Sequence, residues 1–530
     1  MTSLVDAAPV ARSLQAAAGS PLSRTLWLSG LLPAQAMCSG LGRCGRCRVR
    51  FCDAADCPPP LPEEEEILGL DAVAKGWRLA CRRQVPDVAR LRLEVPVSLA
   101  IVPSVPAPDA SNAPNAPDGP GVPAALGVDL GTTSVYYRAV RQDDGALLAE
   151  GHFLNPQAGA GADVMSRLAT ARQAGMAEKL AALAREAVRE GLAATYAAGG
   201  RVEALCVAGN TAMTDILLER SVEGLCAAPY RLDYAGHDTA RLPELPPVYI
   251  PPLMAPFVGG DISAGLAALM AAGTPRPFAL ADLGTNGELA LLDAEDRLYL
   301  VSVPLGPALE GIGPECGLQA GPESITEFRL SPQGLVGASS LAPTPTTQFE
   351  GISATGYLSL LSLLRQTGLM DAEGHFTPDS VSMPLARRLA GDLTRRHGHP
   401  CLQLPYGLRL TAQDVEELLK VKAAFSLALR SLLEAASLRP ADLACLCLAG
   451  ALGEHVPVEH LERLGFVPQG LGARIRAVGN AALDGAVLLA RQPERREALA
   501  RICAGARLIP LADAPDFHQQ YLRHMHFGVA

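Results

Sequence analysis

Two stretches of the chain repeat one pattern of apolar and polar positions. ALGVDLGTTSVYYRAV begins at Ala125, and FALADLGTNGELALLD begins at Phe278. In each, a short apolar run leads into Asp-Leu-Gly-Thr and a second strand-like run. After a turn a third run follows, ALLAEGHF in the first copy and RLYLVSV in the second. Runs bounded by turn residues predict a three-stranded meander in both places. Because Asp129 and Asp282 lie 153 residues apart, the repeat predicts two homologous lobes rather than a solenoid.

Helical periodicity fills the intervals between these strands. Apolar residues at three- and four-residue spacing, or shorter apolar stretches, predict helices over 176–196, 261–272, 411–436 and 484–505. The third of these segments begins with Thr411 and Asp414, which form a plausible capping box. The fourth is expected to break or kink near Pro493. Strands and helices together predict α/β lobes.

A proline-rich stretch, IVPSVPAPDASNAPNAPDGPGVPAA, occupies residues 101–125. Proline removes a backbone donor and fixes φ, so this stretch cannot form a helix or a central strand. It predicts a semi-rigid, exposed linker between a cysteine-rich module and the two lobes. The predicted boundaries are 1–25 for an N-terminal segment, 26–100 for the cysteine-rich domain, 101–125 for the linker, 126–274 for the first lobe and 275–530 for the second lobe.

Composition and charge narrow the function classes. A chain of 530 residues exceeds what one core usually supports, and 49% of the residues are hydrophobic, so several globular domains are expected. No apolar run approaches the ~20 residues that cross a bilayer. The first thirty residues lack a basic start followed by an apolar stretch, so we expect a cytoplasmic protein without a membrane partner. A net charge of −10 and only 4% aromatic residues argue against a nucleic-acid binder.

Cysteines are concentrated near the start of the chain. Six of the thirteen lie before residue 82; Cys38, Cys44 and Cys47 fall within MCSGLGRCGRCRVRFC, and Cys81 follows in GWRLACRRQV. In a long cytoplasmic chain this crowding indicates metal ligation rather than a disulfide framework. A 2Fe–2S cluster needs four thiolates, and glycines allow a loop to wrap closely around it. The pattern therefore predicts a 2Fe–2S cluster held by these four cysteines.

Three alternatives compete for this loop. Structural zinc also uses four cysteines, but zinc sites usually pair two Cys-x2-4-Cys knuckles, and the second knuckle is missing here. The segment GLGRCG satisfies the dinucleotide fingerprint G-x-G-x-x-G, which needs a strand before it and a helix after it; here a strand follows. Finally, Cys52 or Cys57 could replace Cys81 as the fourth ligand.

The loop resembles that of the 2Fe–2S ferredoxins of the plant and adrenodoxin type. Five residues separate Cys38 from Cys44, as in the adrenodoxin-like members, and GWRLACRRQV resembles the segment that carries their fourth ligand. The resemblance implies a β-grasp ferredoxin-like module at the N-terminus. The first hairpin of such a module is harder to recognise in residues 1–37.

The two Asp-Leu-Gly-Thr turns are candidate phosphate-binding sites. No Gly-x4-Gly-Lys-Ser/Thr segment occurs, so a P-loop ATPase is not supported. An aspartate at a strand end can hold Mg²⁺ directly or through water. The Gly-Thr turn after it presents backbone N–H groups and hydroxyls to phosphate oxygens. One such turn is a weak signal, whereas two facing hairpins would clamp the β- and γ-phosphates of a nucleotide.

These turns resemble those of the superfamily of actin, sugar kinases and large heat-shock chaperones, which implies a two-lobed ribonuclease-H-like ATPase fold. The resemblance implies a first phosphate loop at Asp129, Gly131, Thr132 and Thr133, a second at Asp282, Gly284, Thr285, Asn286 and Gly287, and an adenosine-binding turn at Gly450 and Gly453. Tight helix–strand packing is an alternative explanation for the glycines of CLAGALGEHV, residues 447–456.

The combination of a 2Fe–2S module, a proline-rich linker and two such lobes resembles the ATP-dependent reductive activators of corrinoid-dependent methyltransferases. Further segments, among them NPQAGAGADVMSRL and FVGGDISAGL, resemble landmarks of that family. The resemblance implies that the cluster passes an electron to Co(II) of a corrinoid protein, giving Co(I), and that ATP, Mg²⁺ and an electron donor take part. Asp129 and Asp282 would position Mg²⁺, and Asp261 would orient the attacking water. A helix N-cap explains Asp261 at least as well.

Two other function classes stay open. A small-molecule kinase fused to a ferredoxin would show ATP turnover stimulated by its metabolite. A plain electron carrier with a degenerate nucleotide lobe would reduce its partner without ATP. The sequence does not identify the corrinoid partner or the reductant, and it leaves a homodimer open.

Overall fold

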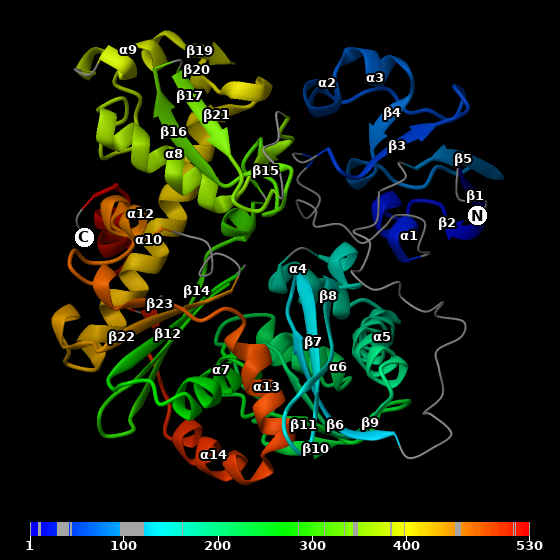
Figure 1. The fold of residues 1–530 in the computed structure, drawn as a ribbon. Coiled ribbons are helices and arrows are strands. Elements are labelled where there is room, and N and C mark those ends of the chain that lie inside the picture. Colours follow the sequence, from blue (N-terminus) through cyan, green and yellow to red (C-terminus); the bar gives the residue numbers. More distant parts are fainter. Residues whose placement is uncertain are drawn as a thin grey trace. The chain divides into compact units, whose positions relative to one another are not determined.

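The structure is a computed structural model of the chain (Figure 1). It describes residues 2–8, 12–28, 42, 45–95, 121–161, 163–284, 286–311, 313–332, 334–342, 348–381, 384–396, 398–450, 457–511, 514 and 516–528. The chain divides into two compact units. The first comprises residues 1–204, 215–230 and 241–247, and the second comprises residues 205–214, 231–240 and 248–530.

The N-terminal part of the first unit is a five-stranded mixed sheet. Its strands are β1 (Thr2–Ala8), β2 (Arg12–Ala17), β3 (Arg48–Phe51), β4 (Trp77–Leu79) and β5 (Arg90–Glu94), in the order β2-β1-β5-β3-β4. β1 and β2 form an antiparallel hairpin, and β1 runs parallel to β5. The helices here are α1 (Leu22–Leu28), α2 (Pro62–Leu68), α3 (Leu70–Ala74) and the 3-10 turn η1 (Ala80–Arg82). Alternation in β3 buries Val49 and Phe51.

Two predicted boundaries differ from the structure. Residues 1–25 were expected as a segment apart from the cysteine-rich domain, yet they contribute the β1–β2 hairpin and the start of α1 to its sheet. Both strands end in two alanines, β1 has only Thr2 and Val5 as β-branched residues, and β2 has neither a β-branched nor an aromatic residue, so the residues that mark strands in a sequence are scarce here. The predicted linker 101–125 overlaps the next strand, which begins at Val122. Residues 96–120 lie outside the described residues.

A six-stranded sheet follows. Its strands are β6 (Val122–Leu130), β7 (Ser134–Arg141), β8 (Leu147–Leu154), β9 (Gly200–Ala208), β10 (Asp238–Ala240) and β11 (Val248–Ile250), in the order β10-β11-β9-β6-β7-β8. β6, β7 and β8 form the predicted antiparallel meander. Helix α5 (Met176–Ala197) packs against these three strands, and α4 (Val164–Ala171) contacts α5. Helix α6 (Thr211–Leu217) follows β9.

The second meander lies in a matching six-stranded sheet of the second unit. Its strands are β12 (Phe278–Leu283), β13 (Asn286–Leu292), β14 (Leu298–Pro304), β22 (Cys445–Ala449), β23 (Ile475–Ala477) and β24 (Arg507–Leu508), in the order β23-β22-β12-β13-β14-β24. Helices α7 (Gly260–Ala271) and α13 (Ala481–Arg491) pack closely against each other, and α7 also contacts β12. The predicted repeat of two meanders is therefore confirmed.

Alternation along β12 decides which side chains reach α7. Ala279, Ala281 and Leu283 belong to the hydrophobic core that includes α10 (Ala412–Ala435) and α8 (Ala354–Thr367). Successive side chains of a strand point to opposite faces, so Leu280 and Asp282 face the α7 side. Leu280 does contact α7, because a Cβ added at Gly265 would lie 2.9 Å from its Cδ2.

The second unit has further strands and helices. They are β15 (Ser324–Ile325), β16 (Glu327–Ser331), β17 (Gly334–Ala338), β18 (Gly351–Ile352), α9 (Pro384–Gly391), β19 (Leu393–Arg396), β20 (His399–Gln403), β21 (Arg409–Thr411), α12 (Val458–Leu464), α14 (Arg496–Ala504) and α15 (Phe517–His524). Of these, β16 and α12 contact α8, β20, β21 and α15 contact α10, and α14 contacts α7.

The predicted helices are all present in the structure. Helix α5 begins at the expected residue, and α10 begins after Thr411, whose hydroxyl accepts the N–H of Asp414 at 3.1 Å while the Asp414 carboxylate accepts the N–H of Thr411 at 2.9 Å. The capping box is therefore confirmed. The chain breaks at Pro493, where α13 ends and α14 soon begins.

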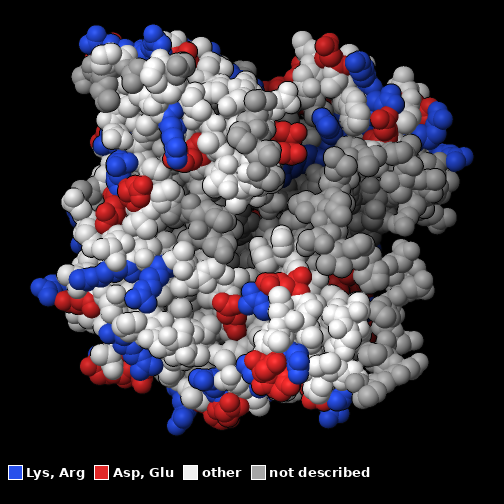
Figure 2. All heavy atoms as spheres, in the orientation of Figure 1, with Lys and Arg blue, Asp and Glu red and all other residues white. Residues whose placement is uncertain are grey.

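Within the described part of the chain, no helix combines the length and the apolar character that crossing a membrane requires. On the face shown in Figure 2, basic and acidic side chains are interspersed over the described surface.

Candidate functional site

The cysteine-rich loop is described in part. Cys38 and Cys44 lie outside the described residues. Cys47 is buried just before β3, and Cys81 is half-buried within η1. Arg48 pairs with Leu79 across the antiparallel β3–β4 ladder, and the N–H of Ala80 donates to the carbonyl of Cys47 at 2.9 Å. Two of the four predicted cluster ligands are therefore brought to the same end of one ladder.

The alternative ligands lie at the other end of that ladder. Cys52 follows Phe51, and the Cys57 thiol approaches the carbonyl of Gly76 at 3.9 Å. The same carbonyl accepts the N–H of Phe51 at 3.0 Å. A strand rises ~3.3 Å per residue, so β3 separates Phe51 from Cys47 by roughly 13 Å. This placement favours Cys81 over Cys52 and Cys57 as the partner of Cys47.

A buried glutamate that the sequence analysis passed over positions the Cys81 segment. Glu64, in the first turn of α2, is 0% exposed. Its carboxylate accepts the N–H of Leu79 at 2.9 Å and Nε of Arg83 at 2.9 Å, on either side of Cys81. Charge-assisted hydrogen bonds of this kind are about twice as strong as neutral ones. The acidic run 63–66 predicts the first turn of a helix, but its pattern does not show which of the four carboxylates is buried.

Two glycines shape the loop before β3. Gly45 and Gly42 have φ of +66° and +75°, in the left-handed region that side chains with a Cβ avoid. A Cβ on Gly42 would lie 3.2 Å from Cδ of Arg82, next to Cys81 in the chain. Among the described residues, no group of three or more Cys, His, Asp or Glu side chains forms a metal site.

The first phosphate turn joins β6 to β7 in the first unit. Asp129 pairs with Tyr136 near the end of the ladder, and Gly131, Thr132 and Thr133 make the turn itself. A Cβ on Gly131 would lie 2.6 Å from the carbonyl oxygen of Ser134, so only glycine fits there. The turn is as tight as the sequence pattern predicts.

The second phosphate turn joins β12 to β13 in the second unit. Gly284 donates its N–H to the carbonyl of Asn286 at 3.1 Å. Thr285 lies outside the described residues. A Cβ on Gly287 would lie 2.7 Å from Cδ1 of Leu305, so a larger residue there would require this leucine side chain to move. Asp282 pairs directly with Glu288 across the ladder.

The predicted adenosine segment reaches the second turn. Gly450, at the end of β22, has φ of +83°, and a Cβ there would lie 3.1 Å from Oδ1 of Asp282. Its N–H donates to the carbonyl of Gly479 at 3.1 Å. The structure therefore brings Gly450 beside Asp282, as a nucleotide site on this turn requires. Gly453 lies outside the described residues.

Asp261 joins Asp282 from the first turn of α7. The helix begins at Gly260 with Gly259 as its N-cap, so Asp261 is not the N-cap that was considered as an alternative. The N–H of Ile262 donates to Oδ1 of Asp261 at 2.8 Å. Burial and then the nearby Asp282 raise the pKa of Asp261 to about 7.

Glu288 completes a group of three carboxyl groups and was missed by the sequence analysis. It is 6% exposed. Burial, followed by the charges of Asp261 and Asp282, raises its pKa well above the ordinary value, and a hydrogen bond from Asn286 opposes this. Glu288 is thus a buried carboxyl group next to two partly exposed ones, Asp261 and Asp282, whose negative charges repel its own. The hairpin register could have revealed Glu288, since residues paired across a ladder share one face.

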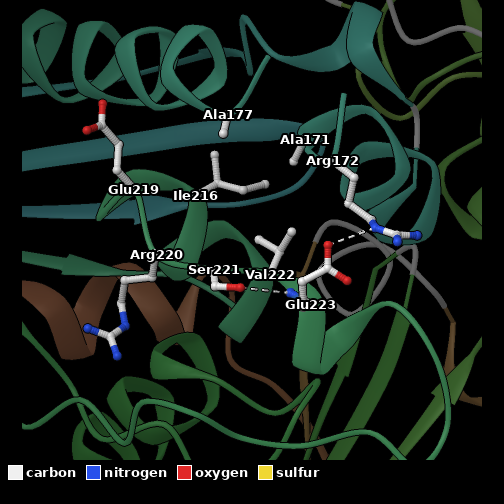
Figure 3. Close-up of a pocket in the computed structure, with 9 residues that line it drawn as sticks. All are labelled: Ala171, Arg172, Ala177, Ile216, Glu219, Arg220, Ser221, Val222 and Glu223. Atoms are coloured by element: carbon white, nitrogen blue, oxygen red, sulfur yellow. Dashed lines mark hydrogen bonds and ion pairs between the residues drawn. The ribbon is translucent and has the colours of Figure 1, made fainter. Parts of the chain in front are cut away.

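The cavity shown in Figure 3 does not coincide with the predicted cluster site or nucleotide site. This hollow of about 150 Å³ lies in the first unit beside α4, α5 and α6. Arg172 and Glu223 point toward each other on its wall, with Nε 2.9 Å from the carboxylate. Arg220 is paired with Asp215 at 3.7 Å. Both arginines are thus engaged with carboxylates, and none of the predicted site residues lines the hollow.

Comparison with known families accounts for most of the chain. Residues 124–272 match the RACo middle region, and residues 277–529 match the C-terminal domain of RACo, the ASKHA domain. The chain belongs to the RACo family. An actin- and sugar-kinase-like domain is therefore confirmed for residues 277–529, within the predicted second lobe.

Individual relatives agree with this family. The chain is 28% identical over 426 residues to the corrinoid activation enzyme RamQ of Eubacterium limosum, covering 76% of this chain and 70% of the relative. It is 26% identical over 297 residues to a [Co(II) methylated amine-specific corrinoid protein] reductase of Methanosarcina barkeri, covering 52% of this chain and half of the relative. A solved structure, a reductive activator for corrinoid,iron-sulfur protein, superposes with a TM-score of 0.66 over 99% of this chain and 98% of that chain at 20% identity, which shows a shared fold.

Proposed function

We propose that this RACo-family protein reduces the cobalt of a corrinoid protein from Co(II) to Co(I) in an ATP-dependent reaction. The observation that carries the proposal is the pair of RACo matches, which together span the region of both phosphate turns. Two relatives are named as a corrinoid activation enzyme and as a Co(II) corrinoid protein reductase. The partner is accordingly a corrinoid protein, and an external reductant supplies the electron.

In this proposal the nucleotide binds to the two Asp-Leu-Gly-Thr turns. Asp129 and Asp282 position Mg²⁺, which shields the phosphate charge when bound. The turn residues Gly131, Thr132, Thr133, Gly284, Thr285, Asn286 and Gly287 hold the phosphates, and Gly450 and Gly453 hold the adenosine. The adjacency of Asp261, Asp282 and Gly450 supports this assignment. Asp261 orients the attacking water, because its carboxyl group is held by the N-terminus of α7 beside Asp282.

The N-terminal sheet is proposed to be a β-grasp 2Fe–2S module. Its order, with a β1–β2 hairpin and β5 parallel to β1, supports that fold. Cys38, Cys44, Cys47 and Cys81 would hold the cluster, and the placement of Cys47 and Cys81 at one end of the β3–β4 ladder fits four-thiolate ligation. When bound, the cluster carries one electron at a time. The buried Glu64, which bonds Leu79 and Arg83, would hold the segment that carries Cys81 in place for ligation.

ATP is needed in this scheme because a ferredoxin-type donor reduces Co(II) unfavourably. Nucleotide binding or hydrolysis can drive the reaction only if it favours one state of the complex over another. The proline-rich sequence between β5 and β6 supports this scheme, because a semi-rigid linker would let the redox module reach both its electron donor and the corrinoid protein.

The test is a visible spectrum recorded under anaerobic conditions. The co-encoded Co(II) corrinoid protein is mixed with this protein and a reductant, with and without Mg-ATP. Co(I) formed only with ATP supports the proposal. Equal Co(I) formation without ATP favours an ATP-independent electron carrier. No Co(I), with the cobalt still reducible chemically and ATP turnover stimulated by a metabolite, favours a kinase fused to a ferredoxin.

A further inference from the structure

Asn155 supports the first phosphate turn from beneath. It follows β8 in the segment Asn-Pro-Gln and is 0% exposed. Its side-chain Nδ2 donates to the carbonyl of Gly131 at 2.7 Å, and its backbone N–H donates to the carbonyl of Thr133 at 2.8 Å. One buried residue therefore holds two carbonyl groups of the turn.

The amide of Asn155 is itself held in one orientation. Its Oδ1 accepts the N–H of Gln157 at 2.8 Å, so the side chain donates at one end and accepts at the other. Gln157, also 0% exposed, donates Nε2 to the carbonyl of Leu180 in α5 at 2.7 Å. The turn is thus connected through Asn155 and Gln157 to the helix that covers the meander. Of the common residues of this size, only asparagine supplies both a donor and an acceptor here.

These bonds fix the direction of a peptide group. In a trans peptide the C=O and the following N–H point to opposite sides of the chain. Holding the Gly131 carbonyl against Asn155 therefore fixes where the N–H of Thr132 points. A phosphate-binding turn works through such N–H groups, so the buried amide determines the geometry of the turn without reaching its surface.

The second copy of the repeat provides an internal comparison. Ser134 corresponds to Gly287 in the repeat. Ser134 pairs with Leu154 between β7 and β8, and Gly287 pairs with Val303 between β13 and β14. The next residues, Asn155 and Pro304, therefore occupy corresponding places below the two turns. Pro304 has no side-chain amide, and the residue after it, Leu305, packs against Gly287. The two turns are supported differently, one by hydrogen bonds and the other by apolar packing.

We propose that Asn155 is the positioning residue of the first phosphate turn and sets its affinity for the β- and γ-phosphates of ATP. This inference rests on the proposed nucleotide-binding function. Asn155 does not touch the nucleotide. It acts through the peptide between Gly131 and Thr132, and Pro304, which has no side-chain donor, cannot act in this way in the second turn.

The test compares variants of the full-length protein with its cluster loaded. Asn155→Leu removes both the side-chain donor and the side-chain acceptor, and Asn155→Asp keeps the shape but loses the donor. We expect both to raise the Kd for Mg-ATP about tenfold or more, because the Gly131 carbonyl loses its partner. The Kd for AMP, which lacks the β- and γ-phosphates, is expected to stay within about twofold. Calorimetry measures both constants.

A matched control removes a buried hydrogen bond elsewhere in the same unit. Thr195, 0% exposed, donates Oγ1 to the carbonyl of Gly191 within α5 at 2.7 Å. Thr195→Val should lower thermal stability without changing the ratio of the two constants. Equal weakening of ATP and AMP in the Asn155 variants, or none, would overturn the inference. If Asn155→Leu does not fold, the isosteric Asn155→Asp variant alone tests the inference. A wild-type protein that fails to bind Mg-ATP would instead refute the proposed function.

Discussion

Asp282 and Glu288 are direct partners across the β12–β13 ladder, and both are on the face that meets α7. Paired residues of an antiparallel ladder have Cβ atoms about 5 Å apart. Asp261 approaches the same place from α7, and the pKa values of Asp261 and Glu288 are raised by burial and by this crowding of acids. The second unit therefore keeps three mutually repelling carboxyl groups near one another.

Removing the charge of Asp282 should abolish most of the ATP-dependent reaction. We expect Asp282→Asn to lower Mg-ATP hydrolysis about 100-fold, because the amide holds a divalent cation more weakly than a carboxylate does. Reduction of the cluster by an external reductant should be unchanged. Phosphate release measures the hydrolysis rate, and bleaching of the visible spectrum measures reduction of the cluster.

The matched control for this variant is Asp296→Asn, an exposed aspartate at the turn after β13. It should leave hydrolysis unchanged. Normal hydrolysis by Asp282→Asn would remove Asp282 from the proposed site, while loss of cluster reduction would indicate general misfolding.

Adding one methyl group at Gly450 should disturb the same site. A Cβ there would lie 3.1 Å from Oδ1 of Asp282, and φ is +83°. Gly470 has a similar φ of +85° with open space around its Cβ position. Both Gly→Ala variants should therefore lose about 1–2 kcal/mol of stability from the left-handed backbone. We expect only Gly450→Ala to raise the KM for Mg-ATP as well, and equal KM values would contradict the proposed role of Gly450.

The local patterns of the sequence predicted much of this site. Short segments of the sequence predict the two Asp-Leu-Gly-Thr turns, the helix at 261–272 and the role of Gly450. The structure brings Asp261, Asp282 and Gly450 together. Local signals succeed here because a tight turn needs particular residues at particular places. They identify which residues form the turns but do not give the neighbours on the next element.

The residues missed by sequence analysis are those whose role depends on tertiary contacts. Glu288 resembles any polar residue of an alternating strand until the register with Asp282 is known. Glu64 is one of four consecutive glutamates, and only the fold shows that it is buried. Asn155 follows a strand as turn residues often do, and its contact with Gly131 spans 24 residues of sequence. Burial and long-range pairing are not local properties of the chain.

The cluster assignment gives a prediction about individual cysteines. Cys81→Ser should lose the visible absorbance of the cluster and most of its iron, because a serine hydroxyl is a poor substitute for a thiolate ligand. Cys57→Ser should retain both, because Cys57 lies at the Gly76 end of the β3–β4 ladder, away from Cys47. Iron analysis and visible spectra of the purified variants measure the outcome. Loss of the cluster in Cys57→Ser together with its retention in Cys81→Ser would reverse the assignment.

A buried histidine anchors the C-terminal helix. His524 is 6% exposed, and its Nδ1 lies 2.7 Å from Oγ of Ser426 in α10. Lys422, 0% exposed, donates Nζ to the carbonyl of His524 at 3.1 Å. Burial and then the Lys422 charge lower the pKa of His524 to about 4.

This histidine should make the protein less stable in mild acid. Its pKa is about 4 in the folded state and about 6.5 when unfolded, so the unfolded state binds the extra proton first. The stabilisation is fully present above about pH 6.5 and is lost as the pH falls towards 4. Between about pH 7.5 and pH 5 the loss is about 2 kcal/mol. We therefore expect His524→Gln to flatten the fall of the unfolding free energy over this range, whereas His518→Gln, an exposed position on the same helix, should not. Denaturant titrations at both pH values measure the difference, and parallel losses in wild type and His524→Gln would contradict the assignment.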